Sequence, residues 1–237
     1  PKTGVIQEPP DFHGFKNIHI VEILYKSFGI PVYLELGAHV GAMSELFYGN
    51  KKGYDNFLYI SVDNWIGGCS VSNRTVYQGS NGLAGHMGGV VLERDAMDEK
   101  RCLSGCLQDY ASITAITKWA QENGTDPNIT WNRIVTEARH GESFARKVIE
   151  RLVWYLGTAF INAVALLDIQ CIYISGPILQ GEDLIIPALE ETVNRLMFAP
   201  EVRRVDVLAA KYSNNNAQII GAAPLVLERR FEEEVTL

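Results

Sequence analysis

The chain has few of the features that mark secreted or disulfide-stapled proteins. Only four cysteines are spread over 237 residues, at positions 69, 102, 106 and 171. So sparse a set does not build the disulfide framework of a small secreted domain, and we expect reduced thiols. The chain also opens without the charged and then apolar leader of a secreted protein, so we expect a cytoplasmic location.

Long apolar runs and an excess of basic charge are absent as well. The longest uncharged stretch, 152–167, is shorter than the roughly 20 residues that span a bilayer and contains Asn162, so it predicts a buried helix and no membrane span. Lys and Arg number 21 against 28 Asp and Glu, which gives a net charge of −7. Nucleic-acid-binding surfaces are normally basic. We therefore expect DNA contact only through a further domain outside this chain.

The composition is that of a globular protein, with 47% hydrophobic and 21% charged residues, and periodicity predicts alternating strands and helices. Strands are predicted over 30–36, 56–63, 169–177 and 203–210, with a hairpin turn at 72–74. Helices are predicted over 40–49 and 109–124, as a short helix broken near Gly141 and followed by a long one, and over 183–196 and 215–234. This alternation indicates an α/β fold.

One stretch, "QGSNGLAGHMGG" at 78–89, is unusually rich in glycine. Its glycines, at positions 79, 82, 85, 88 and 89, allow turns and close approach of the backbone to a ligand. A ligand site is therefore predicted here, although the glycines alone do not define its chemistry.

Five separated segments occur in a characteristic order: "GIPVYLELGAHVGAMSE", "GSNGLAGHMGG", "CLSGCLQDYAS", "YISGPI" and "AQIIGAAPLVLE". Together they resemble the ROK family of bacterial repressors and sugar kinases, over nearly the whole chain. The resemblance implies an actin-like ATPase (ribonuclease H-like) fold of two lobes. Residues 1–50 with 216–237 would form the remainder of the small first lobe, and 51–215 the large lobe with a buried central helix. The family's opening strand and Asp-x-Gly-x-Thr phosphate loop do not occur in this sequence, so we expect the first lobe to be truncated at its N-terminus.

The resemblance also implies which positions would carry catalysis. ROK sugar kinases have Asn-Asp after the Pro-Val strand, and the Asp acts as general base. Here those positions hold Leu36 and Gly37, and a glycine cannot supply general-base catalysis, commonly worth about 10² to 10⁴ in rate. The neighbouring Glu35 is expected on the opposite face of the strand. His39 is either a substitute base or a solvated or capping residue at a helix start.

The nucleotide loops of the family are altered too. Its Gly-Thr-Gly-x-Gly-Gly phosphate turn reads "DNWIGG" at 63–68, where Asp63 adds negative charge and Trp65 occupies the nucleotide's approach. The nucleoside loop, usually Gly-Gly-Gly, is "SGPI", in which Pro177 removes a backbone donor. We therefore expect no nucleotide cofactor.

The family's Glu-x-Gly-His element has lost its functional side chains as well. The Glu position, a sugar contact, is His86, and the zinc-binding His position is Gly89. Of three zinc-binding cysteines only Cys106 remains, too few for a closed tetrahedral site. No metal is therefore expected. Cys102 and Cys106 either form an improvised metal site with His86 or are two ordinary buried thiols.

These losses predict a non-catalytic module of a ROK-like transcriptional regulator that senses a sugar or sugar-phosphate effector. The resemblance implies that this module forms a homodimer through its large lobe. Four polar residues are predicted to bind the effector's hydroxyl groups, although each is alternatively a hydrogen-bonded turn residue: His86, Asn64, Asn81 and Gln108, the last at another sugar-contacting Glu of the family. Two alternatives stay open. One is an active sugar kinase with unusual catalytic residues, and the other is a ligand-free pseudo-kinase whose cleft is plugged by Trp65.

Overall fold

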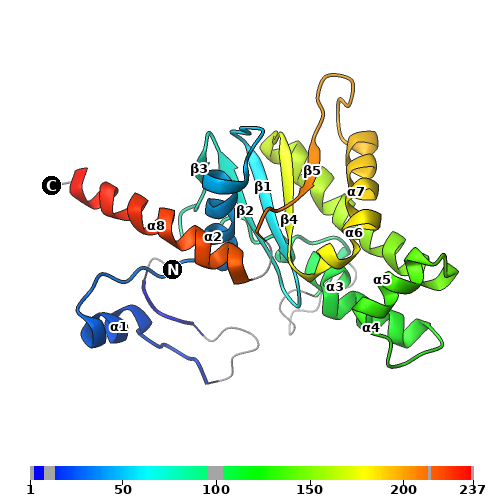
Figure 1. Cartoon of the computed structure of the whole chain (residues 1–237), viewed down its shortest axis with the longest axis horizontal. Coiled ribbons are helices and arrows are strands. Elements are labelled where there is room, and N and C mark those ends of the chain that lie inside the picture. The colour runs from blue at the N-terminus through cyan, green and yellow to red at the C-terminus, as the bar shows by residue number, and fades with distance from the viewer. Residues whose placement is uncertain (1–2, 8–13, 95–103, 213–214, 236–237) are drawn as a thin grey trace.

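A mixed five-stranded sheet forms the centre of the protein (Figure 1). The structure, a computed structural model, describes residues 3–7, 14–94, 104–212 and 215–235. The strands are β1 (Phe57–Val62), β2 (Ile66–Ser72), β3 (Thr75–Val76), β4 (Cys171–Ser175) and β5 (Asp206–Ala209). Their order is β3-β2-β1-β4-β5, with antiparallel pairing among β1, β2 and β3 and parallel pairing among β1, β4 and β5.

Helices cover both faces of this sheet (Figure 1). On one side lie α2 (Gly37–Ser44), which continues as a π-helical turn over Glu45–Gly49, and α8 (Asn215–Val235). The other side carries α3 (Leu107–Ala111), α4 (Ile113–Asn123), α5 (Trp131–Arg139), α6 (Ser143–Leu167) and α7 (Glu182–Leu196). The remaining helix, α1 (Ile20–Phe28), buries none of its residues.

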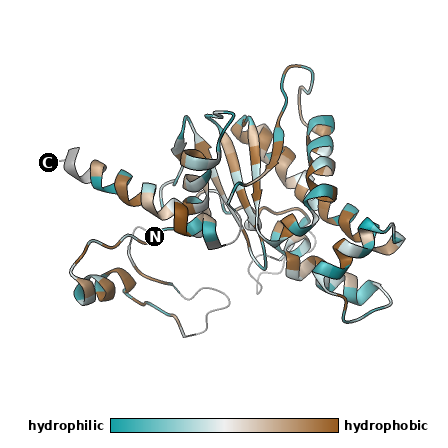
Figure 2. Cartoon of the chain, in the orientation of Figure 1, coloured by the Kyte–Doolittle hydropathy of each residue, from teal (hydrophilic) through white to brown (hydrophobic). Residues whose placement is uncertain are grey.

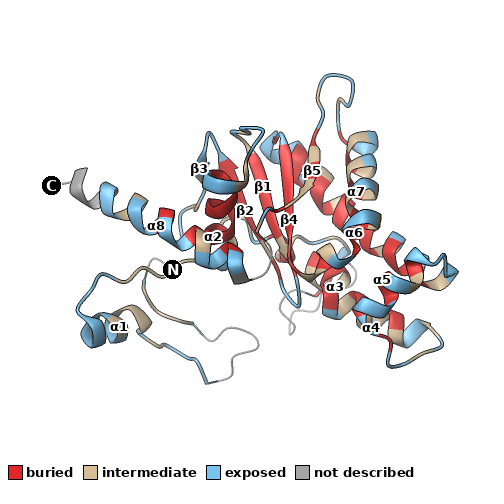
Figure 3. Cartoon of the chain, in the orientation of Figure 1, coloured by how far each residue is buried: buried red, intermediate tan, exposed pale blue. Residues whose placement is uncertain are grey.

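Strand periodicity divides the core into two clusters. Successive side chains of a strand point to opposite faces, so Leu58 and Ile60 join the cluster under α3–α7 while Phe57 and Tyr59 join the one under α2. The central strands are apolar on both faces and buried (Figures 2 and 3). Such strands need helices on each side, as the observed layers provide.

The long helix α6 is the principal core helix. Its length and composition would suffice to cross a membrane, but 61% of its most apolar window is buried inside the protein. Tertiary packing accounts for this apolarity, because α6 lies under α3, α5 and α7. The prediction of a buried helix over 152–167 is confirmed.

Two glycines bring α2 close to its neighbours. A Cβ on Gly41 would lie 2.5 Å from the ring of Tyr59 in β1, and one on Gly221 of α8 would lie 1.8 Å from the carbonyl oxygen of Val40. Both distances are below any real Cβ contact, so only glycine permits this packing. These close contacts hold α2 between the sheet and α8.

Most predicted elements are confirmed. The strands at 56–63 and 169–177, the helices at 183–196 and 215–234, and the helix break near Gly141 all occur close to their predicted bounds. The strand predicted over 203–210 is β5, at the sheet edge. The hairpin between β2 and β3 turns at Asn73 and Arg74, which both have positive φ. A two-residue turn needs positive φ at both positions if its twist is to match that of the strands.

Three predictions about local structure were wrong. No strand forms over 30–36, because among the described residues no strand lies beside this segment to pair with it. The helix predicted over 40–49 begins earlier, at Gly37. The helix predicted over 109–124 is interrupted at Ser112, whose extended backbone ends α3 and whose hydroxyl accepts the N–H of Ala115 to start α4. The proposed division into two lobes remains a prediction.

Candidate functional site

The Gly-rich stretch lies flat against β2 because its glycines have no side chains. Gly85 has a φ of +86°, and a Cβ there would lie 2.6 Å from the carbonyl oxygen of Gly68. A Cβ on Gly88 would lie 2.6 Å from the carbonyl oxygen of Ile66. Backbone thus packs on backbone, and the glycines that suggested ligand approach first serve to seat this loop on the sheet.

Of the four predicted ligand residues, the structure joins Asn64 and Gln108. The Gln108 side chain accepts the N–H of Ile66 and donates to the carbonyl of Asn64, both at 2.7 Å. The Asn64 side chain in turn accepts the hydroxyl of Thr114 at 2.8 Å. Gln108 therefore braces the turn between β1 and β2, which agrees with its alternative interpretation as a hydrogen-bonded turn residue.

The other two residues, His86 and Asn81, are exposed on the Gly-rich loop. Within the described part of the chain neither side chain makes a hydrogen bond or an ion pair. His86 precedes the short 3-10 turn Met87–Gly89, and a Cβ on Gly88 would lie 3.2 Å from Oε1 of Gln108. The loop that carries His86 therefore borders the braced turn, with polar side chains available to a ligand.

A buried network that was not predicted connects this loop to α2 and α8. Nδ1 of His39 lies 3.0 Å from Oε1 of Glu35, and Nε2 lies 3.1 Å from the carbonyl oxygen of Ala84 in the Gly-rich loop. The other carboxylate oxygen of Glu35 accepts a hydrogen bond from Arg229 of α8 at 3.2 Å. His39 is only 1% exposed, so its interpretation as a solvated or capping residue is wrong. The buried position arises because α2 lies between the sheet and α8.

The contacts of this network fix its charge state. Burial acts to lower the pKa of His39, but the hydrogen bonds to Glu35 and Ala84 outweigh it and raise that pKa above its ordinary value. Burial likewise acts to raise the pKa of Glu35, yet hydrogen bonds from His39, Leu36 and Arg229 lower it. Because both His39 nitrogens face acceptors, the imidazolium form satisfies both bonds. A His39 held in this way is a poor general base.

Gly37, where the family resemblance predicts a general base, has no side chain that could accept a proton. Gly37 is the exposed first residue of α2, and a Cβ there would lie 3.3 Å from the side-chain nitrogen of Gln218. Trp65, at the family's phosphate turn, is 40% exposed in the turn between β1 and β2. Neither Gly37 nor Trp65 has an acidic or basic side chain.

The described residues contain no group of three His, Cys, Asp or Glu side chains that would hold a metal ion. Cys69, Cys106 and Cys171 are buried thiols outside any disulfide among the described residues, and burial raises the pKa of the Cys69 thiol. Cys102 lies outside the described residues, so the improvised site with His86 and Cys106 stays untested.

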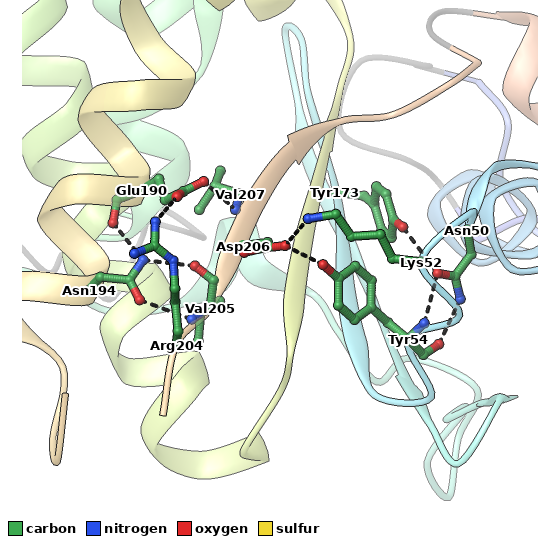
Figure 4. Close-up of polar contacts among 10 residues, drawn as sticks. All are labelled: Asn50, Lys52, Tyr54, Tyr173, Glu190, Asn194, Arg204, Val205, Asp206 and Val207. Carbon is green, nitrogen blue, oxygen red and sulfur yellow. Dashed lines mark hydrogen bonds and ion pairs between the residues drawn. The ribbon is translucent and has the colours of Figure 1, made fainter. Parts of the chain in front are cut away.

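Two carboxylates, those of Asp206 and Glu190, anchor the edge strand β5 through polar contacts (Figure 4). Asp206 accepts hydrogen bonds from Lys52 and Tyr54, and Lys52 holds the pKa of Asp206 below its ordinary value. On the other side of the strand, Glu190 of α7 forms an ion pair with Arg204 at 2.6 Å. No sequence pattern singled out these residues, because their partners come from distant segments.

Glu45 is a third polar group without a sequence signal. It is fully buried in the π-helical turn and its Oε1 accepts the backbone N–H groups of Lys211 and Tyr212, which lead from β5 to α8. Its Oε2 has no partner among the described residues, and burial raises the pKa of Glu45. This carboxyl group therefore holds the connection into α8 against α2.

The mixed sheet with helices on both faces is the fold of the actin-like sugar kinases. The chain belongs to the ROK family, whose pattern it matches over residues 1–229. It superimposes on the ROK hexokinase of Thermus thermophilus with a TM-score of 0.81 at 25% identity, covering 94% of this chain and 73% of that structure.

Relatives of two kinds resemble the chain. The glucokinase of Thermotoga maritima is 25% identical over 96% of this chain and 76% of its own length. The xylose repressor of Bacillus spizizenii is 22% identical over 90% of this chain and 55% of its own length. The chain thus spans about three quarters of the kinase and little more than half of the repressor. The family therefore includes both catalytic and regulatory relatives of this protein.

Proposed function

We propose that this chain is the sugar-sensing and dimerisation module of a ROK transcriptional regulator, without kinase activity and located in the cytoplasm. One observation supports the proposal: Gly37, where the family resemblance predicts a general base, has no side chain, while Glu35 and His39, two positions away on either side, are buried and bonded to each other. No acidic side chain at this point is free to take a proton from a sugar hydroxyl. The similarity to xylose repressors supports a regulatory role, with DNA bound by a domain outside this chain.

The effector would bind beside the Gly-rich loop. His86 and Asn81 would contact sugar hydroxyls directly, while Gln108 would position the turn that carries Asn64. A neutral imidazole donates one hydrogen bond and accepts another but brings no fixed negative charge. Its sugar preference should therefore differ from that of relatives with Glu at this position.

Thermal unfolding with a panel of neutral sugars, sugar phosphates and Mg-ATP tests this function. A ligand at 100 times its dissociation constant adds about 2.7 kcal/mol to the free energy of unfolding. We expect a rise in melting temperature with one sugar class, lost in His86→Ala and retained in His140→Ala, an exposed histidine at the end of α5.

Two outcomes would contradict the proposal in different ways. Stabilisation by Mg-ATP together with sugar-dependent ATP turnover would establish the kinase alternative. No stabilisation by any compound, in a chain shown by circular dichroism to be folded, would favour the ligand-free pseudo-kinase.

A further inference from the structure

Pro224 lies inside α8 and divides the helix into two parts that are held differently. Before it, Gly221 packs so closely on the carbonyl oxygen of Val40 in α2 that no side chain would fit. Beyond the buried Leu225, residues 226–235 extend away from the body of the protein and are here called the α8 arm (Figures 1 and 3). A proline has no N–H and omits one bond of the helical ladder, so helices bend there. The arm can therefore move about Pro224 while the first part of α8 stays packed.

A charged contact ties the α8 arm to the rest of the chain. Three apolar side chains of the arm are largely exposed: Val226, Leu227 and Phe231. Burial of these three side chains therefore contributes little to holding the arm. Arg229, by contrast, is only 32% exposed and donates a hydrogen bond to Oε2 of Glu35 at 3.2 Å. Glu35 is 4% exposed, and a hydrogen bond between charged groups is stronger than one between neutral groups.

Glu35 and His39 continue this contact to the Gly-rich loop. Oε1 of Glu35 lies 3.0 Å from Nδ1 of His39, and Nε2 of His39 lies 3.1 Å from the carbonyl oxygen of Ala84. The imidazole is a rigid ring, so both bonds depend on a single orientation of His39. A displacement of Glu35 that turns the ring therefore alters the bond to Ala84, two residues before His86.

The arm also faces the start of the Gly-rich stretch across a hollow. Two arm residues line one side of it, Glu228 and Arg229, and the other side includes Gln78, Gly79 and Ser80. The hollow has a volume of about 470 Å³. Because tightly packed side chains resist displacement, such a hollow leaves the arm and the loop more room to shift than a packed contact would.

We propose that the α8 arm is the output element of the sugar site, latched to the Gly-rich loop through Arg229, Glu35 and His39. A sugar that seats the loop holds the latch closed, and release of the arm loosens the loop. The coupling is reciprocal, so docking of the arm favours sugar binding by the same factor as the sugar favours docking. The inference rests on the proposed function, because it names the regulation of that sugar site. The latch itself exists without a sugar and can be tested without one.

Hydrogen exchange of the full chain, followed by mass spectrometry, tests the latch. Arg229→Gln removes the positive charge of the latch, so amides of the arm and of the Gly-rich loop should both exchange about fivefold faster or more. Arg229→Lys keeps the charge and should restore most of the protection. Arg204→Gln is a matched control, because it removes an ion pair with Glu190 at 2.6 Å elsewhere in the chain and should change neither segment. Unchanged exchange in β4 separates these local effects from a general loss of stability.

A double variant shows whether the two residues act through one path. His39→Gln cannot donate to both Glu35 and Ala84, so it should also speed exchange in the loop and the arm. Combining it with Arg229→Gln should add little, because each change already breaks the same path. Effects that simply add would overturn the proposal, and so would an unchanged Gly-rich loop in Arg229→Gln.

Sugar titrations distinguish failure of this proposal from failure of the proposed function. D-xylose and D-glucose serve as neutral probes, and the dissociation constant of a sugar that binds should rise about fivefold or more in Arg229→Gln but not in Arg204→Gln. The bound sugar should also slow exchange in the arm. A chain whose loop and arm are coupled but which binds no compound of the panel would support the latch and contradict the sensing function. Sugar binding that Arg229→Gln leaves unchanged would do the reverse.

Discussion

The imidazole of His39 lies 3.0 Å from the carboxylate of Glu35, and both side chains are almost wholly buried. The second ring nitrogen of His39 reaches the carbonyl of Ala84, and Glu35 reaches Arg229. One histidine thus connects the Gly-rich loop to α2, and its partner carboxylate connects α2 to α8. Removing it should affect both the fold and the seating of the loop.

His39→Ala leaves the buried carboxylate of Glu35 without its main partner. Breaking a buried charge pair in this way costs several kcal/mol, so we expect the free energy of unfolding to fall by about 3 kcal/mol. Urea denaturation followed by circular dichroism measures it. The exposed His140→Ala should change stability by no more than about 0.5 kcal/mol, and a loss in His39→Ala as small as this would contradict a stabilising network.

The same pair predicts how stability depends on pH. The pKa of His39 is raised on folding, so its contribution is fully present below pH 6.5, its unfolded value, and is lost as the pH rises through the raised pKa. The pKa of Glu35 is lowered, so its contribution is present above pH 4.5 and is lost as the pH falls through the lowered pKa. The network should therefore contribute most to the free energy of unfolding between pH 4.5 and pH 6.5.

Urea unfolding at half-unit intervals from pH 5 to pH 9 would show this dependence. The difference in free energy of unfolding between the native chain and His39→Gln should shrink as the pH rises above neutrality. A difference that stays constant over the whole range would show that His39 does not change its protonation in the folded protein.

Gly85→Ala tests the packing of the Gly-rich loop on β2. A Cβ at this position would lie 2.6 Å from the carbonyl oxygen of Gly68. Gly53→Ala is a matched control, since Gly53 also has a positive φ but nothing lies within 4 Å of the added Cβ. Both variants carry the strain of a left-handed alanine, about 1 kcal/mol, and Gly85→Ala should cost about 2 kcal/mol more by overpacking. Equal losses in thermal denaturation would contradict the backbone contact.

Gln108→Glu tests whether the amide of Gln108 braces the turn between β1 and β2. A carboxylate still accepts the N–H of Ile66 but cannot donate to the carbonyl of Asn64, which the amide of Gln108 does at 2.7 Å. We expect a loss of about 1 to 2 kcal/mol in the free energy of unfolding at pH 7. An increase in stability, or tighter sugar binding, would show that Gln108 does not brace this turn.

The sequence was sufficient for most of the order of elements, because local pattern reports local structure. The apolar run at 152–167 predicted a buried helix, and Asn73 with Arg74 predicted a hairpin turn. The ordered motifs also indicated the ROK family, which the match over residues 1–229 confirms. Each of these signals depends on residues that are close in the chain.

The sequence did not predict the contacts between segments that are distant in the chain. Residues 30–36 have the pattern of a strand, but a strand also needs a neighbour, and the described residues provide none. His39 reads as a residue at a helix start, and only the packing of α2 between the sheet and α8 buries it. Ligand binding by Gln108 stays a prediction, and only the folded chain shows that its amide bonds the turn between β1 and β2.

The sequence by itself thus determined the α/β class and the family, since both are written in residue identities along the chain. Tertiary structure alone decided which polar groups are already bonded and which face solvent. Hydrogen bonds and burial depend on residues that folding brings together, so the exposed His86 and the buried pair of Glu35 and His39 emerged only from the folded chain.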